Sequence, residues 1–247
     1  MVKYCCSSRA RHRHRVVDRR AAAMVVLALT LTGAGAAVPV SDFAAAGLDG
    51  WDARVFDGET RYRIVDDDGH RVLEGRADAS ASGLFRELTV DLERTPRLAW
   101  RWWIDAPVSV PDERARSGDD FAARVYVVFD GGWAFWRTTT VVYVWADADA
   151  PKAPWRNPFT SQARMIAVRR GGGGHWHEEV RDVRADYRAL FDRDPPPIVA
   201  VAVMADTDQS GTQARARWAD LRFLPPEAHV PAPPAAVGAL LSPSGDS

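Results

Sequence analysis

The stretch FAARVYVVFDGGWAFWRTTTVVYVWAD, residues 121–147, holds two runs rich in valine, threonine and aromatic residues on either side of Gly131 and Gly132. β-Branched and aromatic side chains favour strands, and paired glycines favour a turn. The stretch therefore predicts two strands joined by a turn.

Similar short apolar runs, separated by turn residues, continue on both sides of this stretch. YRIV and HRVLEG flank DDDGH and predict a hairpin. Trp100, Trp102 and Trp145 stand in alternating apolar patterns, which predicts that they are buried. The other runs that predict strands are LAWRWWID (98–105), ARMIAVRR (163–170), WHEEVRDV (176–183), IVAVAVMAD (198–206) and ARARWADLRF (214–223).

A single helix is expected at about residues 184–193, where Tyr187, Leu190 and Phe191 share a face and three prolines follow. Regularly spaced strands with one helix indicate an all-β fold, a two-sheet antiparallel β-sandwich of the jelly-roll type. A parallel α/β sheet would need helical stretches between most strands, and the sequence lacks them.

The first 37 residues differ from the rest of the chain. The basic run RARHRHRVVDRR is followed by an uncharged apolar segment and by the small residues Ala34, Gly35 and Ala36. This order is typical of a secretory signal peptide, which we assign to residues 1–37. One alternative is an uncleaved membrane anchor, since about 20 uncharged residues could span a bilayer. The other is that translation starts at Met24.

Signal cleavage would change the charge and the location of the protein. It removes seven of the 32 basic and one of the 33 acidic residues, which leaves a net charge of −7, and it removes both cysteines. A nucleic-acid binder normally carries a basic surplus, so that class of protein is disfavoured. We expect a periplasmic or secreted protein with no membrane segment after cleavage, a sandwich domain at residues 38–225 and a disordered tail rich in proline and alanine at residues 226–247.

Eight short motifs connect the chain to a known family. They are GLDGW (47–51), ASGLFR (81–86), TPRLAWRW (95–102), GDDFAARVYVVF (118–129), VVYVWA (141–146), NPFT (157–160), RDVRADYRALF (181–191) and DTD (206–208). In these motifs and their order the chain resembles a family of exported bacterial proteins catalogued as domain of unknown function 3047. The resemblance implies a β-sandwich akin to the galactose-binding and lectin-like jelly rolls, and it implies no activity.

Alternating oxygen-bearing side chains predict a metal loop near residue 208. Asp206, Asp208 and Ser210 match the first half of a calcium-binding loop, whereas the second half does not match. The alternative is an Asx turn, in which these side chains accept hydrogen bonds from nearby backbone amides. A structural calcium is therefore the candidate cofactor. His175, His177 and Glu179 have a spacing that could bind zinc, but they also fit a simple amphipathic strand.

Two further patterns predict a ligand site. Asp119 and Asp120 precede a strand and would point to opposite faces, so that one of them could join a site. Arg101 shares a strand face with Trp103, and Arg124 shares one with Tyr126. We expect these four residues to line one groove, because aromatic rings stack on sugars and charged groups bind their hydroxyls. A solvated face of arginine–carboxylate pairs is the alternative.

These patterns favour non-catalytic binding of an envelope or extracellular saccharide, with a polysaccharide as the partner. One alternative is a jelly-roll polysaccharide lyase or glycosidase, in which Tyr126 or His177 is the base and Arg124 holds a uronate carboxylate. A structural envelope protein is the other. The sequence contains no nucleophile elbow and no phosphate-binding glycine loop. It leaves the oligomeric state open.

Overall fold

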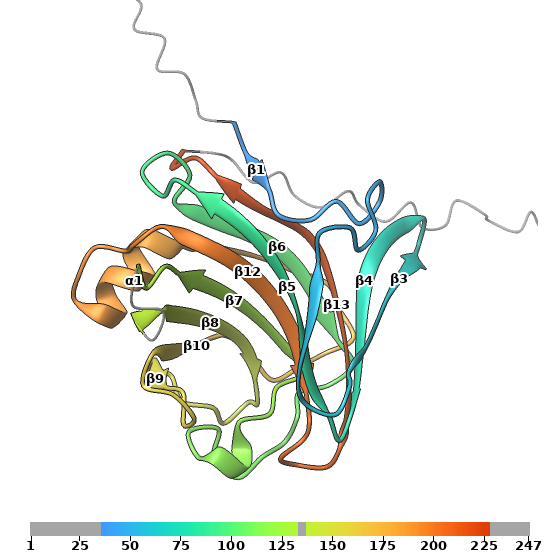
Figure 1. The fold of residues 1–247 in the computed structure, drawn as a ribbon. Helices are drawn as coiled ribbons and strands as arrows, with labels where there is room; N and C mark the ends of the chain where they lie inside the picture. Colours follow the sequence, from blue (N-terminus) through green and yellow to red (C-terminus); the bar gives the residue numbers. More distant parts are fainter. Residues whose placement is uncertain (1–35, 133–136, 228–247) are drawn as a thin grey trace, which may run out of the picture. The chain divides into compact units, whose positions relative to one another are not determined.

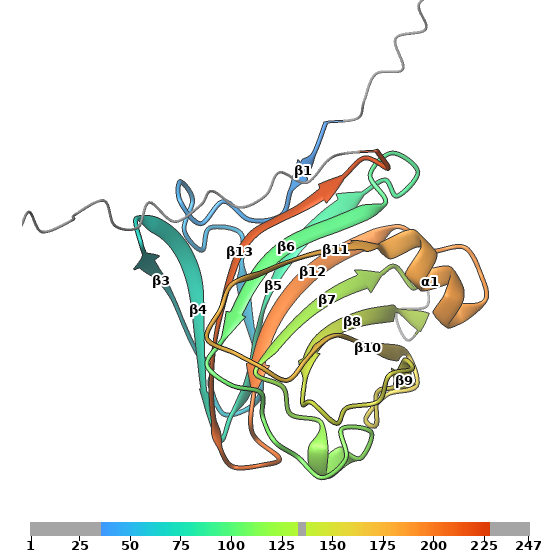
Figure 2. The ribbon, with the colours of Figure 1, turned by 180° about the vertical axis from the view of Figure 1, so that it is seen from behind.

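The computed structural model describes residues 36–132 and 137–227. This part of the chain forms two sheets and one α-helix, which confirms the predicted all-β sandwich with a short helix (Figures 1 and 2). The predicted signal peptide and disordered tail lie almost entirely outside the described residues and stay predictions. Among the described helices, none combines the length and the hydrophobicity that a membrane crossing requires.

The first sheet has the strand order β11-β6-β13-β4-β3, and β1 pairs with β13 at its end. All of these pairs are antiparallel. Its strands are β1 (Val38–Pro39), β3 (Arg61–Asp67), β4 (His70–Asp78), β6 (Arg97–Ile104), β11 (His177–Asp182) and β13 (Gln213–Leu224). The predicted hairpin is β3–β4, and it turns at Asp68 and Gly69, both with positive φ.

The second sheet has the order β2-β5-β12-β7-β8-β10-β9. Its strands are β2 (Asp52–Asp57), β5 (Ala81–Val90), β7 (Ala123–Phe129), β8 (Thr139–Ala146), β9 (Trp155–Arg156), β10 (Ala163–Arg170) and β12 (Ile198–Asp206). The stretch with two glycines forms the antiparallel pair β7–β8, as predicted.

One pair departs from the predicted antiparallel arrangement. β10 runs parallel to β8, because the segment 147–162 carries the chain back before β10 begins. A parallel pair needs such a crossover connection, which is often helical. Here the crossover is an irregular segment with the short strand β9, so the sequence contains no helical pattern from which the crossover could be predicted.

The core lies between the two sheets and is rich in aromatic rings. Trp100, Trp102 and Trp145 are buried, as predicted. Trp100 stacks on Tyr143 with ring centroids 5.3 Å apart, and it meets Trp102 edge-on at 5.4 Å. The inward-facing residues of β6 thus pack against those of β8, which joins the two sheets.

Helix α1 (Val183–Phe191) closes one end of the core. Asp182 caps it by accepting a hydrogen bond from the Ala185 N–H at 2.8 Å, and Asp192 ends it with a positive φ. The predicted helix, residues 184–193, is thereby confirmed with a shift of one or two residues.

The outward face of the first sheet is a network of arginines and carboxylates. Glu74 on β4 is only 1% exposed although it points outward, because it accepts hydrogen bonds from Arg63 and Arg76 and lies 3.3 Å from Arg217. Burial alone would raise the pKa of Glu74, but the hydrogen bonds from Arg76 and Arg63 outweigh it and lower the pKa to about 2.

We expect Glu74→Gln to lower the free energy of unfolding by about 2 kcal/mol at pH 7, a value reduced for the half-exposed arginines. The folded pKa is below the ordinary value of 4.5. The stabilisation is therefore present above that value and lost as the pH falls towards 2. Urea unfolding of both proteins between pH 7 and pH 3.5 checks this, with exposed Glu87→Gln as the control. If the difference in free energy of unfolding between the two proteins did not shrink at low pH, this prediction would be contradicted.

The outward face of the second sheet is partly covered. Ala150 and Trp155, from the segment 147–162, pack on the outward residues Val142 and Val144 of β8. Phe121, which follows the short 3₁₀ helix Arg116–Gly118, belongs to the same cluster. This second small core raises a wall along one side of the sheet face.

Candidate functional site

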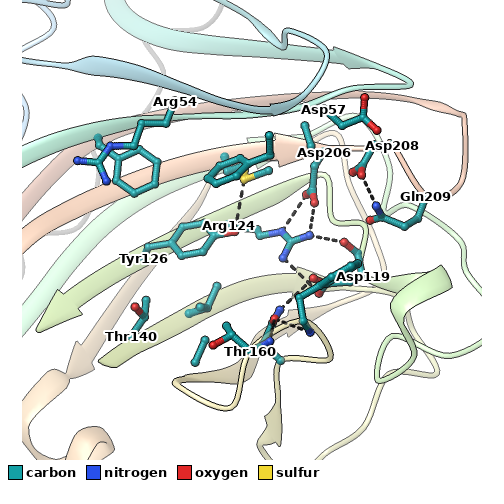
Figure 3. Close-up of a pocket in the computed structure, with 18 of the residues that line it drawn as sticks. Arg54, Asp57, Asp119, Arg124, Tyr126, Thr140, Thr160, Asp206, Asp208 and Gln209 are labelled. Carbon is teal, nitrogen blue, oxygen red and sulfur yellow. Dashed lines mark hydrogen bonds and ion pairs between the residues drawn. The ribbon is translucent and has the colours of Figure 1, made fainter. Parts of the chain in front are cut away.

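Beside that wall, the outward face of the second sheet carries a groove of about 730 Å³ (Figure 3). It extends across the face from β2 to β10, and the turns at 157–160 and 206–209 close its end. Its aromatic and aliphatic lining comes from Phe56, Ala81, Phe85, Tyr126, Val128, Val142, Phe159, Ala163 and Met204, and its polar lining from Arg54, Asp57, Asp119, Arg124, Thr140, Asn157, Thr160, Asp206, Asp208 and Gln209.

Strand register decides which rings reach the groove. Phe85 on β5, Ala202 on β12 and Tyr126 on β7 are paired in one row, so all three point outward. Small Ala202 separates the two rings, whose centroids are 6.5 Å apart. Phe56 on β2 is not in register with Phe85, but its ring lies 6.5 Å from the Phe85 ring. Three rings thus form an aromatic floor that runs from the sheet edge towards its centre.

Two aromatic side chains in this groove are unusually exposed. Phe56 is 63% exposed and Phe159 is 50% exposed, and no other aromatic side chain among the described residues reaches this class of exposure. They come from opposite edges of the second sheet, Phe56 from β2 and Phe159 from the turn that precedes β10. Exposed apolar groups that gather in one concavity indicate a binding site.

Arg124 organises the polar end of the groove. Its guanidinium is buried and donates to both carboxylate oxygens of Asp206, through Nε at 2.8 Å and through Nη2. It also donates to the carboxylate of Asp119 at 3.3 Å and to the Asp119 carbonyl oxygen, and it lies 4.6 Å from the centre of the Phe121 ring. Arg124 is therefore held by two carboxylates, as the dashed lines in Figure 3 show.

The same network fixes the turn that carries Phe159. Asn157 donates to the second oxygen of Asp119 at 2.9 Å, and its own side-chain oxygen accepts from the N–H groups of Phe159 and Thr160. Arg116 lies over the Phe159 ring at 5.3 Å. Hydrogen bonds thus link β12, β7 and the 157–160 turn in one chain, and they set the position of an exposed groove aromatic.

Burial is the largest influence on the pKa values of Asp206, Arg124 and Asp208. It raises the pKa of Asp206, against the opposing effect of Arg124. Burial alone would lower the pKa of Arg124, but Asp119 and Asp206 hold it well above its ordinary value. Arg124 therefore stays charged, and Asp206 is the member of the pair that would take up a proton. Burial and the nearby Asp120 also raise the pKa of Asp208.

The structure adds Asp120 to the predicted metal loop. Carboxylate oxygens of Asp120, Asp206 and Asp208 lie within 4.8 Å of one another. Ser210 lies next to this group, because its N–H donates to Asp120 at 2.6 Å, and its hydroxyl shares a hydrogen bond with Thr212 at 2.8 Å. Asp120 thus accepts backbone hydrogen bonds from the turn, as the Asx-turn alternative expects of such carboxylates. Calcium at these carboxylates stays a prediction.

The structure divides the four residues that were expected to line one groove. Arg124 and Tyr126 line it, but Arg101 and Trp103 point away from the core on β6 of the first sheet. The expectation of a common groove is wrong, because alternation assigns a residue to a face of its own strand and not to a sheet. Of the two adjacent aspartates, Asp119 lines the groove and Asp120 is buried in the carboxylate group.

The residues on β6 instead belong to the arginine–carboxylate network of the first sheet. The guanidinium groups of Arg215 and Arg217 lie 5.1 and 4.8 Å from the centre of the Trp103 ring. Arg101 pairs with Asp220 at 3.2 Å. Both side chains therefore occupy the paired, solvated face that the sequence allowed as the alternative.

His177 and Glu179 point towards the core from β11. His177 lies edge-on to Trp145 at 5.1 Å, and Glu179 accepts from the Trp102 indole at 3.2 Å and from Arg169 at 2.7 Å. His175, His177 and Glu179 do not form a group with metal-ligand spacing among the described residues. Their spacing in the sequence reflects an amphipathic strand.

Sequence reasoning identified Tyr126 but missed the other three groove aromatics, Phe56, Phe85 and Phe159. Phe85 follows buried Leu84 in an alternating strand, so it could have been assigned to an outward face. Phe56 lies in the exposed run DARVFD, and Phe159 lies in the NPFT motif. The available signal was an aromatic residue at a position where a polar residue is usual. That signal does not reveal that the three rings line one groove.

Comparisons with solved structures give loose likenesses to carbohydrate-binding modules. One is the family 11 module of the cellulosomal cellulase Lic26A-Cel5E of Clostridium thermocellum, at TM-score 0.44 and 10% identity over 78% of this chain and 97% of that chain. Another is a family 11 module from the same organism in complex with a β-1,3-1,4-mixed-linked tetrasaccharide, at 0.43 and 9% over 79% and 99%. A third is a module specific for non-crystalline cellulose, CBM28, at 0.41 and 16% over 77% and 95%. At these values the likeness concerns the general fold and not the ligand.

A search of curated protein sequences finds no match. The family comparison matches residues 49–222 to the family described as "Protein of unknown function (DUF3047)". This range begins before β2 and ends within β13, so it leaves out β1 but covers every residue that lines the groove. The chain belongs to the DUF3047 family.

Proposed function

We propose that this protein is an exported domain that binds a saccharide of the envelope or the extracellular medium in the groove, without converting it. The observation that carries the proposal is the placement of exposed Phe56 and Phe159 at opposite edges of one groove. An aromatic ring stacks on the C–H face of a sugar, and two such rings would hold a chain laid across the sheet.

The polar lining supplies what a sugar also needs. Thr140 and Thr160 offer hydroxyl groups, and Tyr126 and Gln209 offer acceptor oxygens besides their own hydrogen bonds to Met204 and Asp208. These groups can donate to and accept from sugar hydroxyls at the same time. The volume of about 730 Å³ is within the range of roughly 300–1,000 Å³ that is usual for ligand pockets. An aromatic floor with a polar rim fits a saccharide better than a purely apolar ligand.

Three observations disfavour the lyase alternative. Arg124 is occupied by Asp119 and Asp206, so it cannot present a free guanidinium to a uronate. Burial raises the pKa of Tyr126, which makes this residue a poor base. His177 packs on core residue Trp145, so the second sheet separates it from the groove.

A structural protein that binds partners through this sheet face would bury Trp103 or place it on an apolar patch. Trp103 lies instead beside Arg215 and Arg217, on a face where arginines pair with carboxylates. Such a face is well solvated and offers little apolar area to a protein partner. This feature supports the groove as the functional surface.

Affinity electrophoresis of the full chain in gels that contain soluble polysaccharides tests the proposal. We expect at least one polysaccharide to retard the protein, and Phe159→Ala to weaken that binding about tenfold, since loss of one stacking ring costs about 1.4 kcal/mol. The half-exposed ring contributes little to folding, so the unfolding midpoint should stay nearly unchanged.

The matched control is Trp103→Ala, which removes an aromatic ring from the outward face of the opposite sheet. It should bind as the unmodified protein does. Equal loss in both variants, or loss in Trp103→Ala alone, would move the binding site to the first sheet. An absence of retardation by every polysaccharide would reject saccharide binding.

A further inference from the structure

The ionisable groups that line the groove have an acidic surplus. Four carboxylates face it, those of Asp57, Asp119, Asp206 and Asp208, against the two arginines Arg54 and Arg124. Arg124 is shared between two of these carboxylates, so that group of three keeps one negative charge while Asp206 is ionised. The buried carboxylate of Asp120 lies directly behind and adds another.

Arg54 lies away from the acidic end of the groove. Its guanidinium lies over the Phe85 ring at 4.5 Å and reaches Glu87 at 4.0 Å. Figure 3 shows Arg54 at one end of the groove and Asp57 and Asp208 at the other. Neither arginine that lines the groove therefore pairs with Asp57 or Asp208 at the acidic end.

In the described part of the chain, Asp57 and Asp208 are the two groove carboxylates that pair with no arginine. Asp57 on edge strand β2 has no hydrogen bond or ion pair within the described residues, and register places it in one row with Ala81 and Asp206. Asp208 has one carboxylate oxygen that is buried without a hydrogen-bond partner there. A carboxylate only accepts hydrogen bonds, so this end suits a group that donates.

We infer that the groove selects an uncharged polysaccharide and rejects chains whose sugars carry carboxylate or sulfate groups. The inference rests on the proposed function and names the ligand class. A neutral sugar brings hydroxyl donors to exposed Asp57 and adds no charge near Asp208. A uronate at this end would bring a negative charge beside the carboxylates of Asp57 and Asp208, and the like charges would repel each other.

Paired polysaccharides that share a backbone and differ in charge test this inference. Hydroxyethyl cellulose is compared with carboxymethyl cellulose, and highly methyl-esterified homogalacturonan with its de-esterified form. We expect the full chain to bind the uncharged member of a pair at least tenfold more tightly. The difference should shrink when sodium chloride is raised to about 0.5 M, since salt screens exposed charges.

The double variant Asp57→Asn/Asp208→Asn should reduce the difference in affinity between the uncharged and charged polysaccharides, because the amides remove two negative charges and keep the shape of the side chains. Glu59→Gln is the control, since Glu59 is two residues from Asp57 but does not line the groove. Equal or tighter binding of the charged members by the unmodified protein would overturn the inference and leave saccharide binding intact. Failure of all four polysaccharides to bind would overturn both.

Discussion

Replacing Arg124 with methionine is expected to lower the free energy of unfolding by about 3–5 kcal/mol, the usual cost of removing one partner from a buried ion pair. The substitution leaves the carboxylates of Asp119 and Asp206 buried without their cation. For a domain of this size the unfolding midpoint should fall by roughly 6–20 °C. Chemical denaturation with urea measures the change directly.

Two variants make this result specific. Arg188→Met removes an arginine whose pair with Asp194 is exposed, and it should cost at most about 1 kcal/mol. Adding Asp206→Asn to Arg124→Met should restore part of the stability, because it removes a carboxylate that has lost its partner. A loss below about 1 kcal/mol in Arg124→Met, or no recovery in the double variant, would contradict the role assigned to this network.

The same substitution should also disturb the groove. Asp119 holds Asn157, and Asn157 holds the backbone of Phe159 and Thr160. Loss of Arg124 frees Asp119 and with it the turn that carries the exposed ring. Arg124 is therefore a positioning residue, which acts on the ligand through the turn and not by contact.

Removing both exposed rings is expected to have the largest effect on binding. Phe56→Ala/Phe159→Ala should weaken the affinity for a retained polysaccharide about 100-fold, as the product of two tenfold losses. The two rings come from opposite edges of the second sheet, so their contributions are expected to add. Isothermal titration calorimetry with each single variant and the double variant measures this.

The control for this pair is Val199→Ala, an exposed apolar side chain that does not line the groove. It should leave the affinity unchanged. If the double variant bound no more weakly than either single variant, the two rings would not contact one ligand together. The groove would then be occupied at one edge only.

Much of the fold could be predicted from alternation along single strands. The buried faces of β6 and β8 and the cap of α1 follow from local patterns, because a strand face or a helix start depends on a few neighbouring residues. The parallel pairing of β10 with β8 could not be predicted, because it depends on the irregular path of residues 147–162.

The site was predictable only in part, for the same reason. Asp119, Arg124, Tyr126 and the DTD motif were singled out by residue type, and the structure brings them to one groove. Register across β5, β12 and β7 decides that Phe85 lies beside Tyr126, and no single strand carries that information. The pairing of Arg124 with Asp206 could not be predicted either, because the two residues are 82 positions apart and lie on different strands.

Hydrogen–deuterium exchange of the full chain, with and without a polysaccharide that retards it in gels, tests the central claim most directly. Saccharide binding in the groove predicts slower exchange in residues 54–57, 157–160 and 206–209, which form its edges. The outward strands of the first sheet should exchange at an unchanged rate. Slower exchange confined to residues 101–103 and 215–217, around Trp103, would contradict the claim and place the ligand on the opposite sheet.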